Sequence, residues 1–150
     1  MSSLQSMPPV TVRVVLRWLL AIFYVGVGFL HLRIAPVLSP LVPPFIPDPI
    51  AMIKFTGLCE IVGGMALLVP PTRPLAGVML ALYAVCVYPA NLHHALDHVV
   101  VRGMPTSWWY HAPRLAFQPV FVWWALYAGE VIDWPGKRRA KVVVPPRVLA

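Results

Sequence analysis

The stretch Phe55-Thr-Gly-Leu-Cys-Glu60-Ile-Val-Gly-Gly64-Met-Ala-Leu-Leu-Val-Pro70 decides the fold, because it places one carboxylate inside an apolar run. A charge at membrane depth costs at least about 2.5–3.5 kcal/mol on insertion scales, so such a residue normally faces a bundle interior and has a partner. At helical spacing Gly57, Glu60 and Gly64 share one face, where small residues let another helix approach closely. We expect this face to point at other helices. Glu60 also fits a purely structural role, as a neutral, hydrogen-bonded group that fixes helix packing.

The composition is that of a membrane protein. Of 150 residues, 59% are hydrophobic and 11% are charged, and the mean hydropathy is +0.75. These values lie outside the usual balance of a soluble globule. A helical span needs about 20 mainly apolar residues, and four segments meet this need: 12–33, 51–69, 75–95 and 113–132. The sequence predicts an all-α, polytopic membrane protein, a four-helix transmembrane bundle.

The predicted bundle occupies residues 12–132, between a short N-terminal segment, 1–11, and a basic cytoplasmic tail, 133–150. The first span lacks the small-residue cleavage pattern of a secretory signal. We therefore expect it to be retained as a helix.

The net charge of +7 is explained by membrane topology. Four spans place both termini and the middle loop on one side, with eight basic residues there and four on the other: Arg13, Arg17, Arg73, Lys137, Arg138, Arg139, Lys141 and Arg147 against Arg33, Lys54, Arg102 and Arg114. The positive-inside rule then puts both termini in the cytoplasm. The basic run at 137–141 is expected to contact anionic lipid headgroups, so the partner is the lipid bilayer and no nucleic acid.

Residues 34–50, which we call the lid, contain a dense set of prolines and cannot form a span. Several of the residues between the prolines are apolar. The segment either packs over the mouth of the bundle or forms a plain interfacial loop.

Two cysteines, Cys59 and Cys86, fall near the middle of the second and third spans. Their similar depth permits a pair, but there is no Cys-x-x-Cys motif, and a buried cysteine is more often a small hydrophobe. The sequence leaves their redox role open.

Polar residues gather on the half of the bundle that the charge rule places outside. Glu60 and His31 are the candidate catalytic residues, and no metal ligand is assigned. The candidate ligand-binding residues are Tyr24, Asn91, His94, Arg114 and Gln118. We expect Glu60 to interact with Arg114 or His31, directly or through water.

Pro89 frees one backbone carbonyl inside the third span. Asn91 or a neighbouring histidine is placed to satisfy it. In the first span, Arg17 is expected to reach the lipid headgroups by snorkelling.

Three chemistries fit this set of residues. The first is quinone or quinol binding, in which a histidine hydrogen-bonds a carbonyl and Glu60 accepts or supplies protons. The second is haem held by His31 and His94. The third is a metal at His93, His94 and His98. Quinone is the cofactor that the residues favour, and haem or metal is favoured less.

The sequence resembles the DoxX family of small bacterial membrane proteins over about residues 12–130. The motifs concerned are His31, Val42-Pro-Pro-Phe-Ile-Pro47, Gly57-Leu-Cys-Glu-Ile-Val-Gly-Gly64 with Leu67-Leu-Val-Pro70, Tyr88-Pro-Ala-Asn91 and Arg114-Leu-Ala-Phe-Gln118. The resemblance implies a bundle in the bacterial cytoplasmic (inner) membrane, with Glu60, Asn91 and Arg114 as a family core. The family is named for a thiosulfate:quinone oxidoreductase whose membrane subunit is related to it. The pair His93-His94 and the basic tail do not map to the family pattern.

The expected function is that of a membrane subunit or accessory of a quinone-linked redox system, with an outward-facing polar pocket between the helices. It would work with a redox-enzyme partner or as a homo-oligomer, and whether the chain is itself an oxidoreductase stays open. The alternative is a non-catalytic membrane scaffold or assembly partner, in which the same polar groups only specify helix packing.

Overall fold

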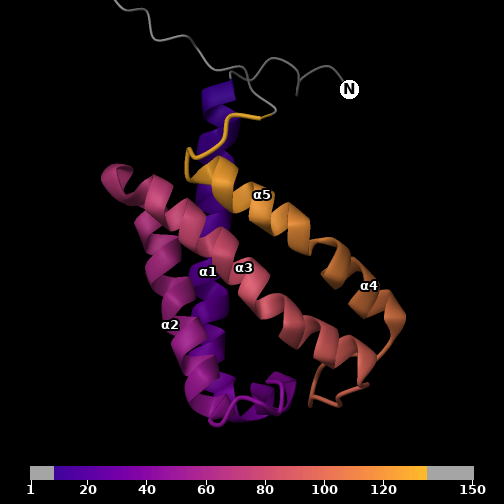
Figure 1. Ribbon diagram of the computed structural model, residues 1–150. Coiled ribbons are helices and arrows are strands. Elements are labelled where there is room, and N and C mark those ends of the chain that lie inside the picture. The colour runs from indigo at the N-terminus through magenta and orange to yellow at the C-terminus, as the bar shows by residue number, and fades with distance from the viewer. Residues whose placement is uncertain (1–8, 135–150) are drawn as a thin grey trace, which may run out of the picture.

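The computed structural model describes residues 9–134, and all regular secondary structure in this range is helical (Figure 1). This confirms the all-α prediction. Three helical stretches are long and apolar enough to cross a membrane: Val12–Leu41, Pro49–Leu68 and Pro70–Leu96. The elements in chain order are α1 (Pro9–Leu38), the 3₁₀ turn η1 (Ser39–Leu41), α2 (Pro49–Leu68), the 3₁₀ turn η2 (Pro70–Thr72), α3 (Arg73–Leu96), α4 (Trp108–Ala116) and α5 (Gln118–Ala128).

The first helix is longer than predicted, because α1 continues through Pro36 to Leu38. The chain bends at Ile34, whose φ of −114° and ψ of 22° are not helical. Pro36 has no N–H to offer the carbonyl of Leu32, one turn earlier, and its ring crowds that carbonyl, so the helix bends in the turn before the proline. The predicted end of the span at residue 33 therefore coincides with a kink instead of a helix end.

The second helix begins where the sequence offers a strong start signal. The side chain of Asp48 accepts a hydrogen bond of 2.9 Å from the backbone N–H of Ala51, and Pro49 occupies the first helical position. A side-chain oxygen before the first turn satisfies one of its free N–H groups, and proline there loses nothing.

The predicted fourth span, 113–132, was wrong in its bounds and in its continuity. The structure has two helices of 9 and 11 residues, α4 and α5, separated at Phe117. Pro113, expected near the first turn, lies inside α4. The break follows from Pro119, which has no N–H for the carbonyl of Leu115.

Gln118, at the start of α5, hydrogen-bonds to the backbone of α3. Its Nε2 donates to the carbonyl of Ala84 at 2.6 Å. This carbonyl is one residue before that of Val85, which Pro89 leaves without its helical donor. Because the freed carbonyl is that of Val85, the prediction that a polar residue after Pro89 satisfies it is not tested by this bond and stays a prediction.

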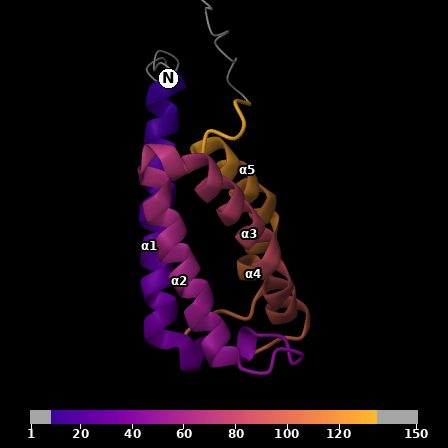
Figure 2. The same cartoon turned by 60° about the vertical axis from the view of Figure 1, so that its left-hand side comes forward.

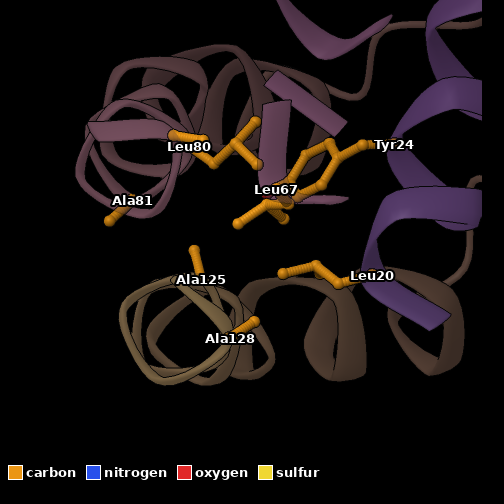
Figure 3. Close-up of a cluster of buried hydrophobic side chains, with 8 residues drawn as sticks. Leu20, Tyr24, Leu67, Leu80, Ala81, Ala125 and Ala128 are labelled. Atoms are coloured by element: carbon orange, nitrogen blue, oxygen red, sulfur yellow. The ribbon is translucent and has the colours of Figure 1, made fainter. Parts of the chain in front are cut away.

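The helices form two groups, α1 with α2 and α3 with α4 and α5, as the two views show (Figures 1 and 2). One apolar cluster joins the groups near the α2–α3 turn; Figure 3 shows its members Leu20, Tyr24, Leu67, Leu80, Ala81, Ala125 and Ala128. A second cluster joins the lid to the α3–α4 loop through Ala35, Leu38, Ile53 and Val101. The two clusters hold the groups together at opposite ends.

The start of α1 and residues 130–133 lie at the same end of the molecule as the α2–α3 turn (Figure 1). The Arg17 side chain is only 4% exposed, its Nε donates to the carbonyl of Ala128 at 2.8 Å, and its guanidinium pairs with Glu130. The expectation that Arg17 snorkels to headgroups is therefore wrong, because protein groups satisfy it.

Much of the predicted charge bias falls outside the described residues. At the end where α1 begins, the structure describes Arg13, Arg17 and Arg73, and the remaining five basic residues of that set belong to 135–150. The assignment of both termini to the cytoplasm and the division of the chain at residues 12 and 132 therefore stay predictions.

Candidate functional site

A cavity of about 1350 Å³ lies between the α1–α2 pair and the group formed by α3, α4 and α5. Its walls are mostly apolar. Six of the seven predicted site residues line it: Tyr24, His31, Glu60, Asn91, Arg114 and Gln118. His94 is not among the lining residues, so the sequence-based set divides into two groups.

The contact between α1 and α2 places glycines opposite the polar side chains. A Cβ added to Gly28 would lie 3.1 Å from the Cβ of Glu60, and one added to Gly57 would lie 2.9 Å from the Cβ of His31. The same added Cβ on Gly28 would lie 2.5 Å from the carbonyl oxygen of Gly57. The backbones of α1 and α2 therefore approach too closely for any residue but glycine at position 28. This is the close helix contact that was predicted for the face of Gly57, Glu60 and Gly64.

Tyr24 repeats this arrangement one step further along the interface. A Cβ added to Gly64 would lie 3.4 Å from the Cβ of Tyr24 and 3.0 Å from the carbonyl oxygen of Ala21. The side chains of Tyr24, His31 and Glu60, which line the cavity from α1 and α2, thus each face a glycine of the other helix.

The predicted contact between Glu60 and His31 is present. Glu60 is 3% exposed, and its Oε2 lies 2.6 Å from Nδ1 of His31. The contact lacks hydrogen-bond angles, and neither atom has another hydrogen-bonding partner in the described part of the chain. Buried polar atoms in native proteins are nearly always paired. Nδ1 of His31 and Oε2 of Glu60 thus contact each other beside an apolar cavity, and the remaining ring nitrogen of His31 and carboxylate oxygen of Glu60 are groups that can hydrogen-bond a ligand.

Tyr83 of α3 belongs to this site and was missed from the sequence. Its side chain interacts with Glu60 and with Thr56 of α2. Tyr83 and Thr56 both line the cavity. A signal was available, because Leu80, Tyr83, Val87 and Asn91 recur at helical spacing on one face of α3.

The second polar group lies between α3 and α4, around a fully buried His94. Nη1 of Arg114 lies 2.8 Å from Nδ1 of His94. A guanidinium can only donate, so His94 accepts at Nδ1 and has its proton on Nε2. The ring of His111 lies 4.6 Å from that of His94, at 86°. Arg114 thus contacts His94, and the alternative pairing of Arg114 with Glu60 is not found.

The haem and metal alternatives find no geometric support in residues 9–134. His31 and His94, the proposed haem ligands, belong to different polar groups, and Arg114 occupies Nδ1 of His94. His93, a proposed metal ligand, pairs with Asp97 at 2.5 Å. Within the described range, no three His, Cys, Asp or Glu side chains gather where they could hold a metal ion.

The lid and the two cysteines border the cavity. Lid residues between Leu38 and Ile46 line it, which supports the lid alternative over a plain loop. Cys59 of α2 and Cys86 of α3 also line it as free thiols, the first half-buried and the second exposed.

These features define a class of protein: over residues 9–134 its regular structure is all helical, with three helices apolar enough to span a membrane and a polar pair facing an apolar cavity. A family model described as a domain of unknown function, DUF8561, matches residues 20–129. The chain belongs to this family, and the matched region contains all seven predicted site residues. No curated protein and no solved structure matches the chain.

Proposed function

We propose that the chain is a multi-pass protein of the bacterial cytoplasmic membrane and acts as a membrane subunit or accessory of a quinone-linked redox system. Three apolar helices would supply three crossings. The helices α4 and α5 have 9 and 11 residues. Neither alone has the length of about 20 residues that a crossing needs, but the two together do. They would form a broken fourth crossing, which agrees with the two described chain ends lying at one end of the molecule (Figure 1).

The observation that carries the proposal is the Glu60–His31 pair on the wall of an apolar cavity. A quinone ring is apolar with two carbonyl acceptors, and it supplies two-electron, two-proton chemistry when bound. Glu60 and His31 would hold its head, His31 by donating a hydrogen bond. Glu60 would accept or supply a proton at its carboxylate. Asn91 of α3 also lines the cavity and is a further hydrogen-bonding group.

The role of an accessory to a redox enzyme is supported by the resemblance of the Glu60, Asn91 and Arg114 motifs to the DoxX family. The partner would be a redox enzyme that exchanges electrons with the bound quinone. A second copy of the chain is the other partner that this proposal admits.

The test is binding of a short-tailed ubiquinone analogue to the purified protein in lipid nanodiscs. We expect Glu60→Gln and His31→Asn each to weaken binding roughly tenfold, since each removes one charge-assisted hydrogen bond. His98→Asn is the control, because His98 is exposed with a φ of 50°, a geometry that asparagine tolerates. Absence of binding to the wild type, or equal binding by all variants, would reject the proposal.

The glycine contacts favour a scaffold as the second candidate. Gly28 and Gly57 fit Glu60 and His31 into the α1–α2 interface, so the pair also contributes to packing. A scaffold predicts that Glu60→Ala removes folded protein from the membrane and that added quinone does not restore it. A quinone site predicts that quinone raises the thermal stability of the wild type.

A further inference from the structure

The cavity has one wall made of exposed apolar side chains. They follow the same helical spacing on two helices, Phe55, Leu58 and Val62 on α2 and Met79, Leu82 and Cys86 on α3. The five large side chains among them are each more than half exposed, from 54% for Leu58 and Leu82 to 63% for Phe55. Both helices are apolar enough to span a membrane. Exposure on such helices is exposure to lipid.

Three other contacts between the helices are close, while Phe23 of α1 and Phe117, between α4 and α5, also line the cavity and are 42% and 55% exposed. The α1–α2 seam is closed by the Gly28–Gly57 contact. Between α1 and α5, the rings of Phe23 and Phe121 stack with centroids 5.2 Å apart. Between α3 and α5, a Cβ added to Gly77 would lie 2.8 Å from the carbonyl oxygen of Ala125.

The α2–α3 seam is closed only near its turn. There a Cβ added to Gly63 would lie 2.6 Å from the side chain of Leu80. Beyond this point the two helices run apart toward the lid, as both views show (Figures 1 and 2). The exposed lining side chains of α2 and α3 occupy this diverging part.

We propose that a membrane-borne amphiphile enters the cavity sideways from the lipid between α2 and α3. Its head is an uncharged ring with hydrogen-bonding groups, placed at Glu60 and His31, and its alkyl or isoprenoid tail extends through the seam. This rests on the proposed function and adds the route and the requirement for a tail. A charged, water-soluble substrate is disfavoured, because mostly apolar walls cannot compensate for the free-energy cost of taking its charge out of water.

The size of the cavity agrees with a tailed ligand. Pockets for compact small molecules occupy about 300–1,000 Å³. The cavity here has about 1350 Å³ and is continuous with the exposed side chains of α2 and α3. A ring at Glu60 would leave the space between the two helices for a chain.

The route can be tested without any quinone, through a nitroxide attached to Cys59. The chain has two cysteines, so Cys86→Ala leaves Cys59 as the single attachment site. In phosphatidylcholine nanodiscs, we expect dissolved oxygen, which concentrates in lipid, to relax the nitroxide several-fold more than a water-soluble nickel chelate. Leu82→Trp should reduce the oxygen effect by half or more. A larger relaxation of the nitroxide by the nickel chelate than by oxygen would overturn the lateral route.

Val85→Trp is the matched control for Leu82→Trp. Both residues lie on α3 and are similarly exposed, at 56% and 54%, but Val85 does not line the cavity. Equal oxygen effects in the two tryptophan variants would also overturn the route. Because neither readout involves quinone, failure of the proposed function would appear separately, as absence of quinone binding with an open seam.

The requirement for a tail is tested by comparing a decyl-substituted benzoquinone with the same ring lacking the decyl group. We expect the tailed compound to bind at least tenfold more tightly to the wild type. Leu82→Trp should slow its association about tenfold, and Val85→Trp should leave the rate unchanged. Equal affinity for the two compounds would overturn the requirement.

Discussion

Nδ1 of His31 on α1 and Oε2 of Glu60 on α2 lie 2.6 Å apart, and each side chain faces a glycine of the other helix. The candidate site is thus built into a helix–helix interface, without a loop. Changes in the packing of α1 on α2 should therefore alter the site directly, which makes several predictions possible.

Gly28→Ala should destabilise the protein by about 1–3 kcal/mol, the usual cost of overpacking. The added methyl group would lie 2.5 Å from the carbonyl oxygen of Gly57, a backbone atom that can move only with its helix. The measurement is thermal or denaturant-induced unfolding in detergent. The His31–Glu60 contact should loosen, so quinone affinity should fall together with stability.

Gly26→Ala is the control for Gly28→Ala. Gly26 lies two residues away on the exposed side of the same helix, with no atom within 4 Å of an added Cβ. Since alanine favours a helix over glycine by roughly 0.5–1 kcal/mol, this variant should be neutral or slightly stabilised. Equal loss of stability in both variants would contradict the close approach at Gly28.

Arg17→Met should destabilise the protein by about 1–3 kcal/mol, because the Ala128 carbonyl loses a charged donor and Glu130 loses its closer partner. Arg33→Met, at the exposed opposite end of α1, should change stability by less than about 0.5 kcal/mol. If Arg17 only snorkelled to headgroups, the two variants would behave alike.

Gln118→Met should cost about 1–3 kcal/mol, since the buried side chain would no longer donate to the Ala84 carbonyl beside the Pro89 irregularity. Val120→Met, on the exposed side of α5, is the size-matched control. Hydrogen exchange of the α3 backbone offers a local readout. It should rise around residues 84–89 in the Gln118 variant and stay unchanged in the control.

His94→Leu should separate the two polar groups. Arg114 would lose its buried acceptor, so stability should fall by about 1–3 kcal/mol. His94 does not line the cavity, so quinone affinity of the folded protein should change less than threefold. A tenfold loss of affinity at preserved stability would return His94 to the ligand-binding set.

The helices and the inward face of α2 could be predicted from the sequence because one physical argument determines them. A carboxylate in a long apolar run must face protein, and glycines on its face indicate a close helix. The partner of Glu60 could not be chosen in the same way, because Arg114 and His31 were both within reach. The relative position of α1 and α2 decides this, and it is a tertiary property.

Proline shows a second limit of sequence analysis. Pro36 follows a kink, Pro89 lies inside a continuous α3, and Pro119 begins a new helix after a break. Each removes one helical donor, yet the outcome differs because different neighbours are available. At α3, Gln118 from a segment that is distant in sequence donates to the carbonyl of Ala84, next to the one that Pro89 frees. Tyr83 and Arg17 were misjudged for the same reason, since their partners lie on other elements.

The three glycines that face Tyr24, His31 and Glu60 permit a single alignment of α1 on α2. A slip by one helical turn would bring Glu60 opposite a bulky side chain such as Tyr24 or Leu32. The native alignment of the two helices and the assembly of the polar pair are therefore one event in folding. A ligand that binds the pair would therefore stabilise this alignment over slipped ones.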